Sequence, residues 1–277
     1  MPVIVPVPGP TLGRCPTIRR VPDPRNPDEP TQISVAELER IAALGWRGTS
    51  ERWLGDWLLR AGGGFTGRAN SALVLGPPGR ATDDALAEVS DFYAGHRLPV
   101  RFSVPQGVPG VDRLAGALHD RGFREGGPVL VMVASLATVL AACPPPPGVP
   151  AATLSDTPSA AWLVGYRYRG GAMPASGVAV LTNSDHAVFA EIAADGEQWA
   201  VGRGVVERGW LGVAAVTVAE HRRRSGVGSA VLGDLARWAA PQGVHAVYLQ
   251  VDAANEPAVA LYQRRGFVTH HRYAYWA

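Results

Sequence analysis

The chain has 277 residues and a formal net charge of +2, with 47% hydrophobic and 18% charged residues. This composition describes a folded globular protein with one large domain or two smaller ones, and it excludes a disordered chain. The small net charge argues against a nucleic-acid or membrane-surface partner. All basic residues are arginine, in a chain rich in Ala, Gly and Pro. Arginine clusters are therefore weaker evidence of function than usual.

The sequence has no 18-residue apolar run, and prolines interrupt the apolar N-terminal stretch. We therefore expect neither a membrane span nor a signal peptide. The two cysteines, Cys15 and Cys143, lack the spacing of a metal site or a redox pair. These features predict a cytoplasmic protein with free thiols and no metal ion.

Residues 1–33 are rich in proline and predict an extended tail. Regular structure should begin after Ser34, which has capping-box spacing to Glu37. The periodicity then predicts strands at 56–63, 70–76, 99–105 and 128–134, and helices at 34–45, 82–95 and 111–123. Thr82 is the expected N-cap of the second helix.

Four consecutive prolines in "CPPPPGVP" exclude a helix or a central strand. We place a linker at 143–152, between domains at 34–142 and 153–277. The second domain should have a helix after Asp156, then three strands within 186–218, broken at 194–197 and 207–210. The pattern next predicts a helix at 226–240, a strand at 246–251, a helix capped by Asn255 and a final strand at 270–276.

The two halves resemble each other. Residues 98–123 align with 245–267 when three extra residues are allowed in one loop, and both segments end in Arg-Gly-Phe or Arg-Arg-Gly-Phe. This similarity indicates an internal duplication and two similar domains.

A glycine loop follows the strand at 214–218 and leads into the helix at 226–240. Backbone N–H groups of such a loop and of the helix N-terminus suit a phosphate or pyrophosphate. Glycine at 226 and 228 lets the backbone approach the anion, and Arg223 and Arg224 could add charge-assisted bonds. Alone, this pattern is equally typical of a solvated basic turn.

The loop does not stand alone. Residues 153–277 resemble the GCN5-related N-acetyltransferase superfamily, whose signature is Gln/Arg-x-x-Gly-x-Gly/Ala followed by a strand and a helix with Asn-x-x-Ala-x-x-Leu-Tyr. The matching residues are Arg223, Gly226, Gly228, Asn255, Ala258, Leu261, Tyr262, Gly266 and Phe267. Glu220 departs from the family, which often has proline there. The resemblance implies an α/β (α+β) fold of two such domains, each a mixed, mostly antiparallel sheet flanked by helices.

The resemblance also implies acetyl-CoA as co-substrate. The coenzyme A pyrophosphate would be held by the backbone N–H groups from Arg224 to Ser229, which include Gly226, Val227 and Gly228. The pantetheine arm would pair with the strand at Val216 and Val218 and bond to Asn255. The N–H of Val218 would donate to the oxyanion, and Tyr262 would protonate the leaving thiolate.

The general base is less well defined. Glu191, on the second strand of this half, is the first candidate and Glu207 the second, although either could be a solvated carboxylate and a water chain could replace both. His221 adjoins the loop, while His270 and His271 could line the acceptor cleft.

The first half lacks the glycine motif, and Leu118 stands where the second half has Tyr262. Pro77 and Pro78 remove amide donors, and Asp83 and Asp84 would repel phosphate. Residues 34–142 therefore resemble a degenerate copy, as in tandem-domain actinobacterial proteins of this superfamily.

The sequence thus predicts direct transfer of an acetyl group, in a ternary complex, to a primary amine of a small molecule or peptide. Transfer of a longer acyl group and a non-catalytic acyl-CoA sensor or structural module are the alternatives. We expect a monomer that acts as an internal pseudo-dimer.

Overall fold

The computed structural model describes residues 30–166 and 173–277, so most of the expected N-terminal tail lies outside it. The described part has one mixed sheet of eleven strands in the order β1-β2-β3-β4-β11-β5-β10-β9-β8-β7-β6. The strands are β1 (Ser50–Leu54), β2 (Trp57–Ala61), β3 (Ala72–Val74), β4 (Phe102–Pro105), β5 (Glu125–Ser135), β6 (Thr153–Ser155), β7 (Ala187–Ala194), β8 (Glu197–Glu207), β9 (Trp210–Val218), β10 (Ala246–Asp252) and β11 (Val268–Trp276).

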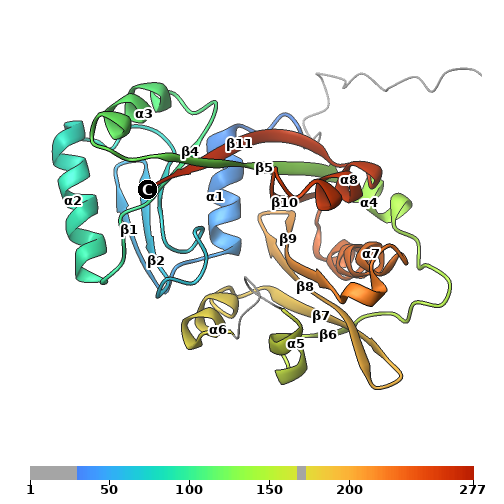
Figure 1. The fold of residues 1–277 in the computed structure, drawn as a ribbon. Helices are drawn as coiled ribbons and strands as arrows, with labels where there is room; N and C mark the ends of the chain where they lie inside the picture. The colour runs from blue at the N-terminus through green and yellow to red at the C-terminus, as the bar shows by residue number, and fades with distance from the viewer. Residues whose placement is uncertain (1–29, 167–172) are drawn as a thin grey trace, which may run out of the picture.

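Helices cover both faces of this sheet (Figure 1). They are α1 (Val35–Gly45), α2 (Thr82–Gly95), α3 (Val111–Asp120), α4 (Leu136–Ala142), α5 (Ala160–Gly165), α6 (Ala175–Leu181), α7 (Val227–Ala239) and α8 (Glu256–Arg264), with short 3-10 turns η2 (Glu220–Arg222) and η3 (Ala240–Gln242). The mixed, mostly antiparallel sheet flanked by helices confirms the predicted fold class. No helix in the described ranges is both long and apolar enough to cross a membrane.

Most predicted elements are present within a few residues of their expected bounds. Ser34 caps α1 by accepting a hydrogen bond from the Glu37 amide at 3.2 Å. The predicted N-cap Thr82 is wrong by one position: Ala81 occupies the cap and Thr82 begins α2. The predictions missed β1, β6, α4 and α6, which are short or lack a clear period.

The two halves exchange their last strands. The parallel pairs β3–β4 and β9–β10 have equivalent positions in the two halves. The strand that follows in the first half, β5, pairs with β10, whereas β11 of the second half pairs with β4. β5 and β11 also pair with each other at the centre, so the sheet is continuous across the predicted domain boundary (Figure 1).

The helices α3 and α8 end in the same way, which supports the duplication. The Phe123 amide donates to the carbonyl of Leu118, and the Phe267 amide donates to the carbonyl of Tyr262, both at 3.1 Å. In each case the intervening glycine has a positive φ, of 87° and 85°. Glycine is the residue that adopts this conformation without strain.

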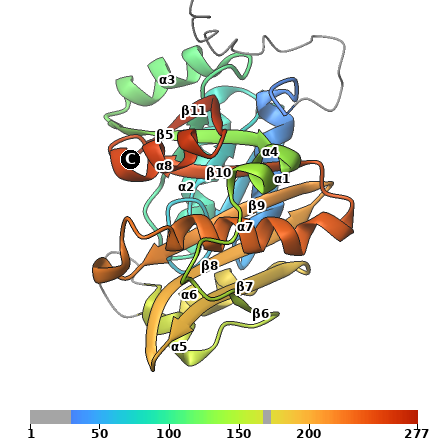
Figure 2. The same ribbon diagram turned by 90° about the vertical axis from the view of Figure 1, so that its right-hand side faces the viewer.

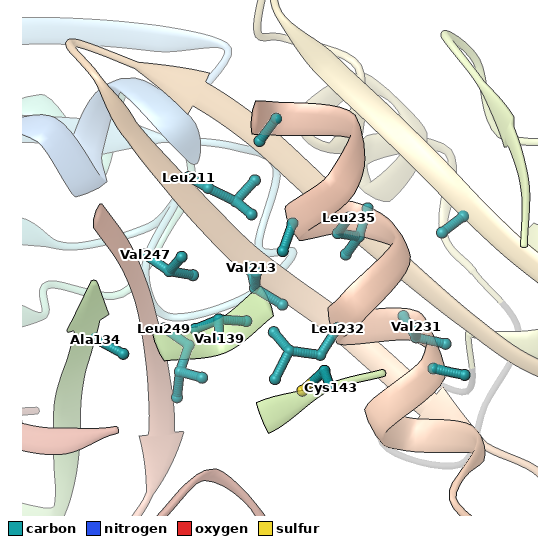
Figure 3. Close-up of a cluster of buried hydrophobic side chains, with 14 of the residues drawn as sticks. Ala134, Val139, Cys143, Leu211, Val213, Val231, Leu232, Leu235, Val247 and Leu249 are labelled. Carbon is teal, nitrogen blue, oxygen red and sulfur yellow. The ribbon is translucent and has the colours of Figure 1, made fainter. Parts of the chain in front are cut away.

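The two faces of the second half have different cores. Leu232 and Leu235 of α7 pack with Val213 and Leu249 of the sheet (Figure 3). Figure 2 shows α7 lying across this face. Neighbouring residues of β10 point the other way, and Tyr248 packs against α1 on the opposite face. Helices α5 and α6 cover that second face further along the sheet, around Phe189.

Because the halves share β5 and β11, we predict that they unfold as one cooperative unit. Leu118 is fully buried in the first half, so Leu118→Ala should lower the free energy of unfolding by about 2–5 kcal/mol. Scanning calorimetry should show one transition, shifted as a whole. Leu118→Met is the matched control and should cost less than about 1.5 kcal/mol. Two thermal unfolding transitions, of which only one is shifted in temperature by Leu118→Ala, would contradict the prediction.

Candidate active site

The parallel strands β9 and β10 part at the middle of the sheet. Their last paired residues are Val213 and Leu249, although β9 continues to Val218 and β10 to Asp252. Beyond this point β9 pairs only with β8, and β10 only with β5. The two strands therefore enclose a fork with backbone groups available on its β9 side.

A bulge in β9 lies at the root of the fork. Ala215 and Val216 both lie opposite Gly202 of β8, and Ala215 has a φ of 56°. Left-handed backbone at a non-glycine residue is strained and is most often kept at functional sites. The bulge bends β9 away from β10.

The strand after the bulge directs alternate amides into the fork. The Ala219 amide donates to the carbonyl of Trp199 on β8, at 2.8 Å. Successive amides of an extended strand point to opposite sides. The N–H groups of Val218 and Val216 therefore point away from β8 and toward the fork.

The glycine loop closes one end of the fork. After η2 the backbone turns through Arg224, with a φ of 63°, and Gly226, with a φ of 86°, and α7 begins at Val227. No hydrogen bond from the amides of residues 224–228 is found within the described ranges. Such a run of free amides at a helix N-terminus is an anion-binding arrangement.

The three arginines of the loop differ in their contacts and in their exposure to solvent. Arg222 lies 3.9 Å from the ring centroid of Trp199 and forms an ion pair with Glu197, so it holds the loop against β8. Arg223 and Arg224 are exposed, and their guanidinium groups form no ion pair with the described residues. These two remain available to an anion at the loop.

Gly228 lies between β9 and α8. A methyl group at Gly228 would lie 3.4 Å from Leu261 Cδ2 and 3.5 Å from Val218 Cγ2, which are ordinary van der Waals contacts. The absence of a side chain at Gly228 therefore keeps the backbone of the loop accessible between these two elements.

Tyr262 lies on α8, next to Leu261, which approaches Gly228. Its ring packs on the core under α7 and contacts Phe267 edge-on, with centroids 5.8 Å apart. Burial raises the pKa of the Tyr262 hydroxyl to about 12. No described residue forms a hydrogen bond to this hydroxyl. Tyr262 is therefore a protonated phenol with its proton available to a ligand.

Asn255 and Ser229, which the sequence analysis placed at the coenzyme A site, already make hydrogen bonds within the protein. Asn255 caps α8 through Oδ1, which accepts from the Ala258 amide at 3.3 Å, and its side-chain NH₂ remains available. Ser229 is buried: its amide donates to the Gly226 carbonyl and its hydroxyl accepts from Arg265 at 2.9 Å. Ser229 thus fixes the start of α7.

Glu191 lies two strands away from the fork. It is paired with Val201 on β8, which is opposite Thr217 on β9. Adjacent strands are about 4.8 Å apart, which puts the Glu191 Cα roughly 10 Å from β9. Its carboxylate accepts a hydrogen bond from Ser159 at 2.7 Å, on the face that α5 and α6 cover.

The remaining candidates lie in different places. Glu207 is opposite Trp210, at the start of β9 and about 26 Å along the strand from Val218, too far to act there. His221 is exposed and bonds to Glu197. His270 and His271 lie together on β11, where His271 contacts the buried carboxylate of Glu39 at 2.9 Å.

The equivalent loop in the first half lines a pocket of about 440 Å³ together with the start of α3, including Arg80 and Arg113. Trp57 donates to the carbonyl of Gly76 at 2.9 Å, and the Asp56 amide donates to that of Pro77. These bonds tie the loop to the turn between β1 and β2. Leu118, the counterpart of Tyr262, is fully buried.

The sequence analysis missed a polar recess on the α1 face at the root of the fork. It is lined by Glu39, Ala42, Ala43, Trp46, Arg60, Arg68, Ser103, Gln250 and Tyr273. The only signal in the sequence was an arginine within the otherwise apolar run "WLLRA". No group of three or more His, Cys, Asp or Glu side chains in the described part of the chain is placed to hold a metal ion.

Comparisons with known proteins agree with this geometry. A family described as "Probable histone acetyltransferase Rv0428c C-terminal" matches residues 33–276. "Uncharacterized N-acetyltransferase YobR" of Bacillus subtilis is 28% identical over 258 residues, which cover 86% of this chain and 97% of that protein. "Probable histone acetyltransferase Rv0428c" of Mycobacterium tuberculosis is 28% identical over 252 residues, covering 90% and 76%.

Solved structures share the fold. A GCN5-related N-acetyltransferase from Kribbella flavida superimposes with a TM-score of 0.66 at 17% identity, covering 88% of this chain and 95% of that one. A tandem protein of this superfamily from the clavulanic acid biosynthesis pathway gives a TM-score of 0.55 at 14% identity, covering 72% and 71%. The chain belongs to the family described by the C-terminal part of Rv0428c, and it is an acyltransferase of the GCN5-related N-acetyltransferase superfamily.

Proposed function

We propose that the protein transfers an acetyl group from acetyl-CoA directly to a primary amine in a ternary complex. The observation that supports this most is the fork between β9 and β10, with free amides on one side and the Tyr262 hydroxyl on the other. Acetyl-CoA would supply the activated acetyl thioester. The names of the two relatives include N-acetyltransferase and histone acetyltransferase, which supports the reaction class.

The glycine loop and β9 would bind and orient the co-substrate. The amides from Arg224 to Gly228 would hold the pyrophosphate, with Arg223 and Arg224 adding charge. The Val216 amide and the side-chain NH₂ of Asn255 would bond the pantetheine arm. The N–H of Val218 would donate to the thioester oxygen as it gains negative charge.

Tyr262 would return a proton to the departing sulfur. Because burial raises its pKa to about 12, the phenol keeps its proton throughout the physiological pH range. Below that pKa the acid form is fully present, and it is lost only as the pH rises through about 12. Any fall in rate at pH 8–10 would therefore come from another group.

Glu191 remains our candidate for the base. From two strands away it would act through water, taking the proton that the acceptor ammonium loses before attack. Val201, between Glu191 and β9, is apolar and buried, so the water relay would have to pass around it.

A non-catalytic acyl-CoA sensor is the second candidate. Free amides alone would suffice for a sensor, which needs no acid. A tyrosine at position 262, half-buried and with no hydrogen bond to its hydroxyl from the described residues, supports the enzyme, because a sensor needs no acid at this place.

Replacing Tyr262 tests the acid role. Tyr262→Phe keeps the ring packing on Phe267, so acetyl-CoA affinity and thermal stability should change little. We expect kcat for coenzyme A release with an amine panel to fall about 10²–10⁴-fold, the usual contribution of a general acid. Tyr93→Phe, at a buried tyrosine of the first half, is the control: it loses the hydrogen bonds between its hydroxyl and the Arg60 backbone and so lowers stability, but it should leave kcat within about threefold of the parent. Unchanged kcat in Tyr262→Phe would refute the role.

Gly228→Ala tests whether acetyl-CoA passes close to the backbone at Gly228. The added methyl meets only ordinary contacts at Leu261 and Val218, and alanine favours a helix, so stability should rise by up to about 1 kcal/mol. The methyl would occupy the path of the pantetheine arm, and we expect at least a tenfold weaker acetyl-CoA affinity by calorimetric titration.

Gly116→Ala in α3 is the matched control, because its methyl would meet no atom within 4 Å. It should stabilise the protein without changing acetyl-CoA affinity. Equal affinities for the two variants would show that acetyl-CoA does not pass Gly228.

We also propose that the protein is a monomer. β5 and β11 already pair the two halves within one chain, which provides internally an interface that two copies could form. Light scattering at micromolar concentration should give the mass of one 29.2 kDa chain. A concentration-independent dimer would contradict this proposal.

A further inference from the structure

The first half has a pocket of its own between the loop that follows β3 and the start of α3. Its volume is about 440 Å³, which is within the usual size of small-molecule sites. β3, α2 and α3 have the same places in the first half as β9, α7 and α8 in the second, and they lie at the other end of the sheet (Figure 1). The strand order β3-β4-β11-β5-β10-β9 puts five strand spacings, roughly 24 Å, between this pocket and the fork. The pocket is therefore separate from the candidate active site.

The backbone around this pocket differs from that of the fork. β3 ends at Val74, and the amide that follows, that of Leu75, donates to the carbonyl of Asp56 at 3.0 Å. Pro77 and Pro78 carry no N–H. The strand pairing proposed for the pantetheine arm at β9 therefore has no counterpart here, and the side chains must decide what the pocket binds.

One wall of the pocket is fixed by the turn between β1 and β2. Trp57 Nε1 donates to the carbonyl of Gly76, and the Asp56 amide donates to the carbonyl of Pro77, both at 2.9 Å. Any side chain at Gly55 would collide with the backbone of Pro78, so the turn and the loop are in close contact. The wall needs no rearrangement to receive a ligand, which reduces the entropic cost of binding.

The floor of the pocket is apolar. It includes Trp57, Val74 and Leu114, which are all buried. The indole N–H is already used by the Gly76 carbonyl, and the ring is held edge-on against Phe102 with centroids 5.9 Å apart. The floor therefore offers an apolar surface and no free side-chain donor, which suits the apolar body of a ligand.

The rim of the pocket is positively charged. Arg113 of α3 is exposed, and its guanidinium has no hydrogen-bond or ion-pair partner among the described residues. Arg80 pairs with Glu88, but the same carboxylate also pairs with Arg52 at 3.3 Å. Two guanidinium groups that share one carboxylate leave one positive charge, and Arg113 adds a second.

No carboxylate opposes these charges inside the pocket. The residues that line it, all within the described ranges, include neither Asp nor Glu. Asp83, which the sequence analysis expected to repel phosphate, pairs with Arg121 and lines a different cavity. The hydroxyl of Thr82 does line the pocket, and it has no partner in the described part of the chain. The pocket thus combines an apolar floor with a cationic, hydrogen-bonding rim.

We propose that this pocket is a second ligand site, which binds a compact organic anion: a carboxylate or phosphate group on an apolar body. Arg113 and Arg80 pair with the anionic group, because guanidinium groups match the geometry of carboxylate and phosphate oxygens. Trp57, Val74 and Leu114 pack against the body. The site takes no part in acetyl transfer, and the inference does not rest on the proposed function.

The test compares probes that share a ring and differ in charge. Phenylacetate, phenyl phosphate, phenylacetamide and benzylamine would be titrated calorimetrically into the protein, free and saturated with coenzyme A. Acetate and inorganic phosphate carry the anionic group without the body. We expect one aromatic anion to bind per chain at millimolar concentration or below, with or without coenzyme A. Phenylacetamide and the two small anions should bind at least about tenfold more weakly, and benzylamine should not bind.

Arg113→Gln should weaken phenylacetate binding at least about tenfold and leave phenylacetamide binding unchanged. It should fold, because the Arg113 side chain has no described partner to lose. Arg80→Gln is a second variant with the same expected direction, and Glu88 then keeps Arg52 as its partner. Arg264→Gln is the matched control: Arg264 is also exposed on a helix and has no side-chain partner within the described ranges. It should change neither affinity.

Thermal unfolding gives a second readout that needs no turnover. A ligand that binds only the folded chain should raise the midpoint of unfolding in the parent and in Arg264→Gln, and much less in Arg113→Gln. The inference would be overturned if neither aromatic anion bound at millimolar concentration, or if phenylacetamide or acetate bound as well as phenylacetate. Phenylacetate affinity that is lost on saturation with coenzyme A would place the anion in the fork and would also overturn it. Unchanged affinity in both Arg113→Gln and Arg80→Gln would do the same, whereas failure of acetyl-CoA to bind would count only against the proposed function.

Discussion

The parting of β9 from β10 is the feature on which the rest of the site depends. If β9 and β10 stayed hydrogen-bonded to each other along their whole length, the amides of β9 would have partners within the sheet. None of these amides would then be available to a ligand. The bulge at Ala215 prevents this, at a strain of about 1–3 kcal/mol for a left-handed residue without a glycine's freedom. The core under α7 packs against both strands and so fixes the geometry of the fork (Figure 3). The roles proposed for the glycine loop and Tyr262 depend on their position around this fork.

The sequence predicted much of this site, because its chemistry is local. The glycine loop, the capping Asn255 and Tyr262 lie within segments whose spacing alone determines which groups share a face or a turn. The surroundings of Glu191 and the recess on the α1 face depend on contacts between segments that are distant in the sequence. The spacing of residues along the chain does not reveal such contacts. Arg60, Arg68 and Gln250 come from separate strands and a loop, and they meet only because the sheet is continuous. Likewise, the short strands β1 and β6 owe their conformation to pairing with a neighbour and not to their own pattern.

The exchange of β5 and β11 gives the first half a part in the site. A degenerate copy attached by a flexible linker could drift without consequence for catalysis. Here α1 covers the face of the sheet opposite α7, and the segment from Arg60 to Arg68 lies against Trp46 beside the fork. The first half thus packs against the face of the sheet opposite α7, beside the fork. The proline linker joins two parts of one sheet. The predicted boundary therefore separates the two repeats of the sequence, and it does not separate two independent sheets.

The order in which the strands are made has a further consequence. β11 is synthesised after every strand it joins, and it fills the gap between β4 and β5 at the middle of the sheet. While the chain is still emerging from the ribosome, β4 presents an unpaired edge, and such edges invite association with other chains. Until β11 has been made and docked, the nascent chain therefore exposes this edge, which a protein of two independently closed domains would not. Substitutions that slow the docking of β11 should reduce the yield of folded protein in cells even where the finished enzyme is stable.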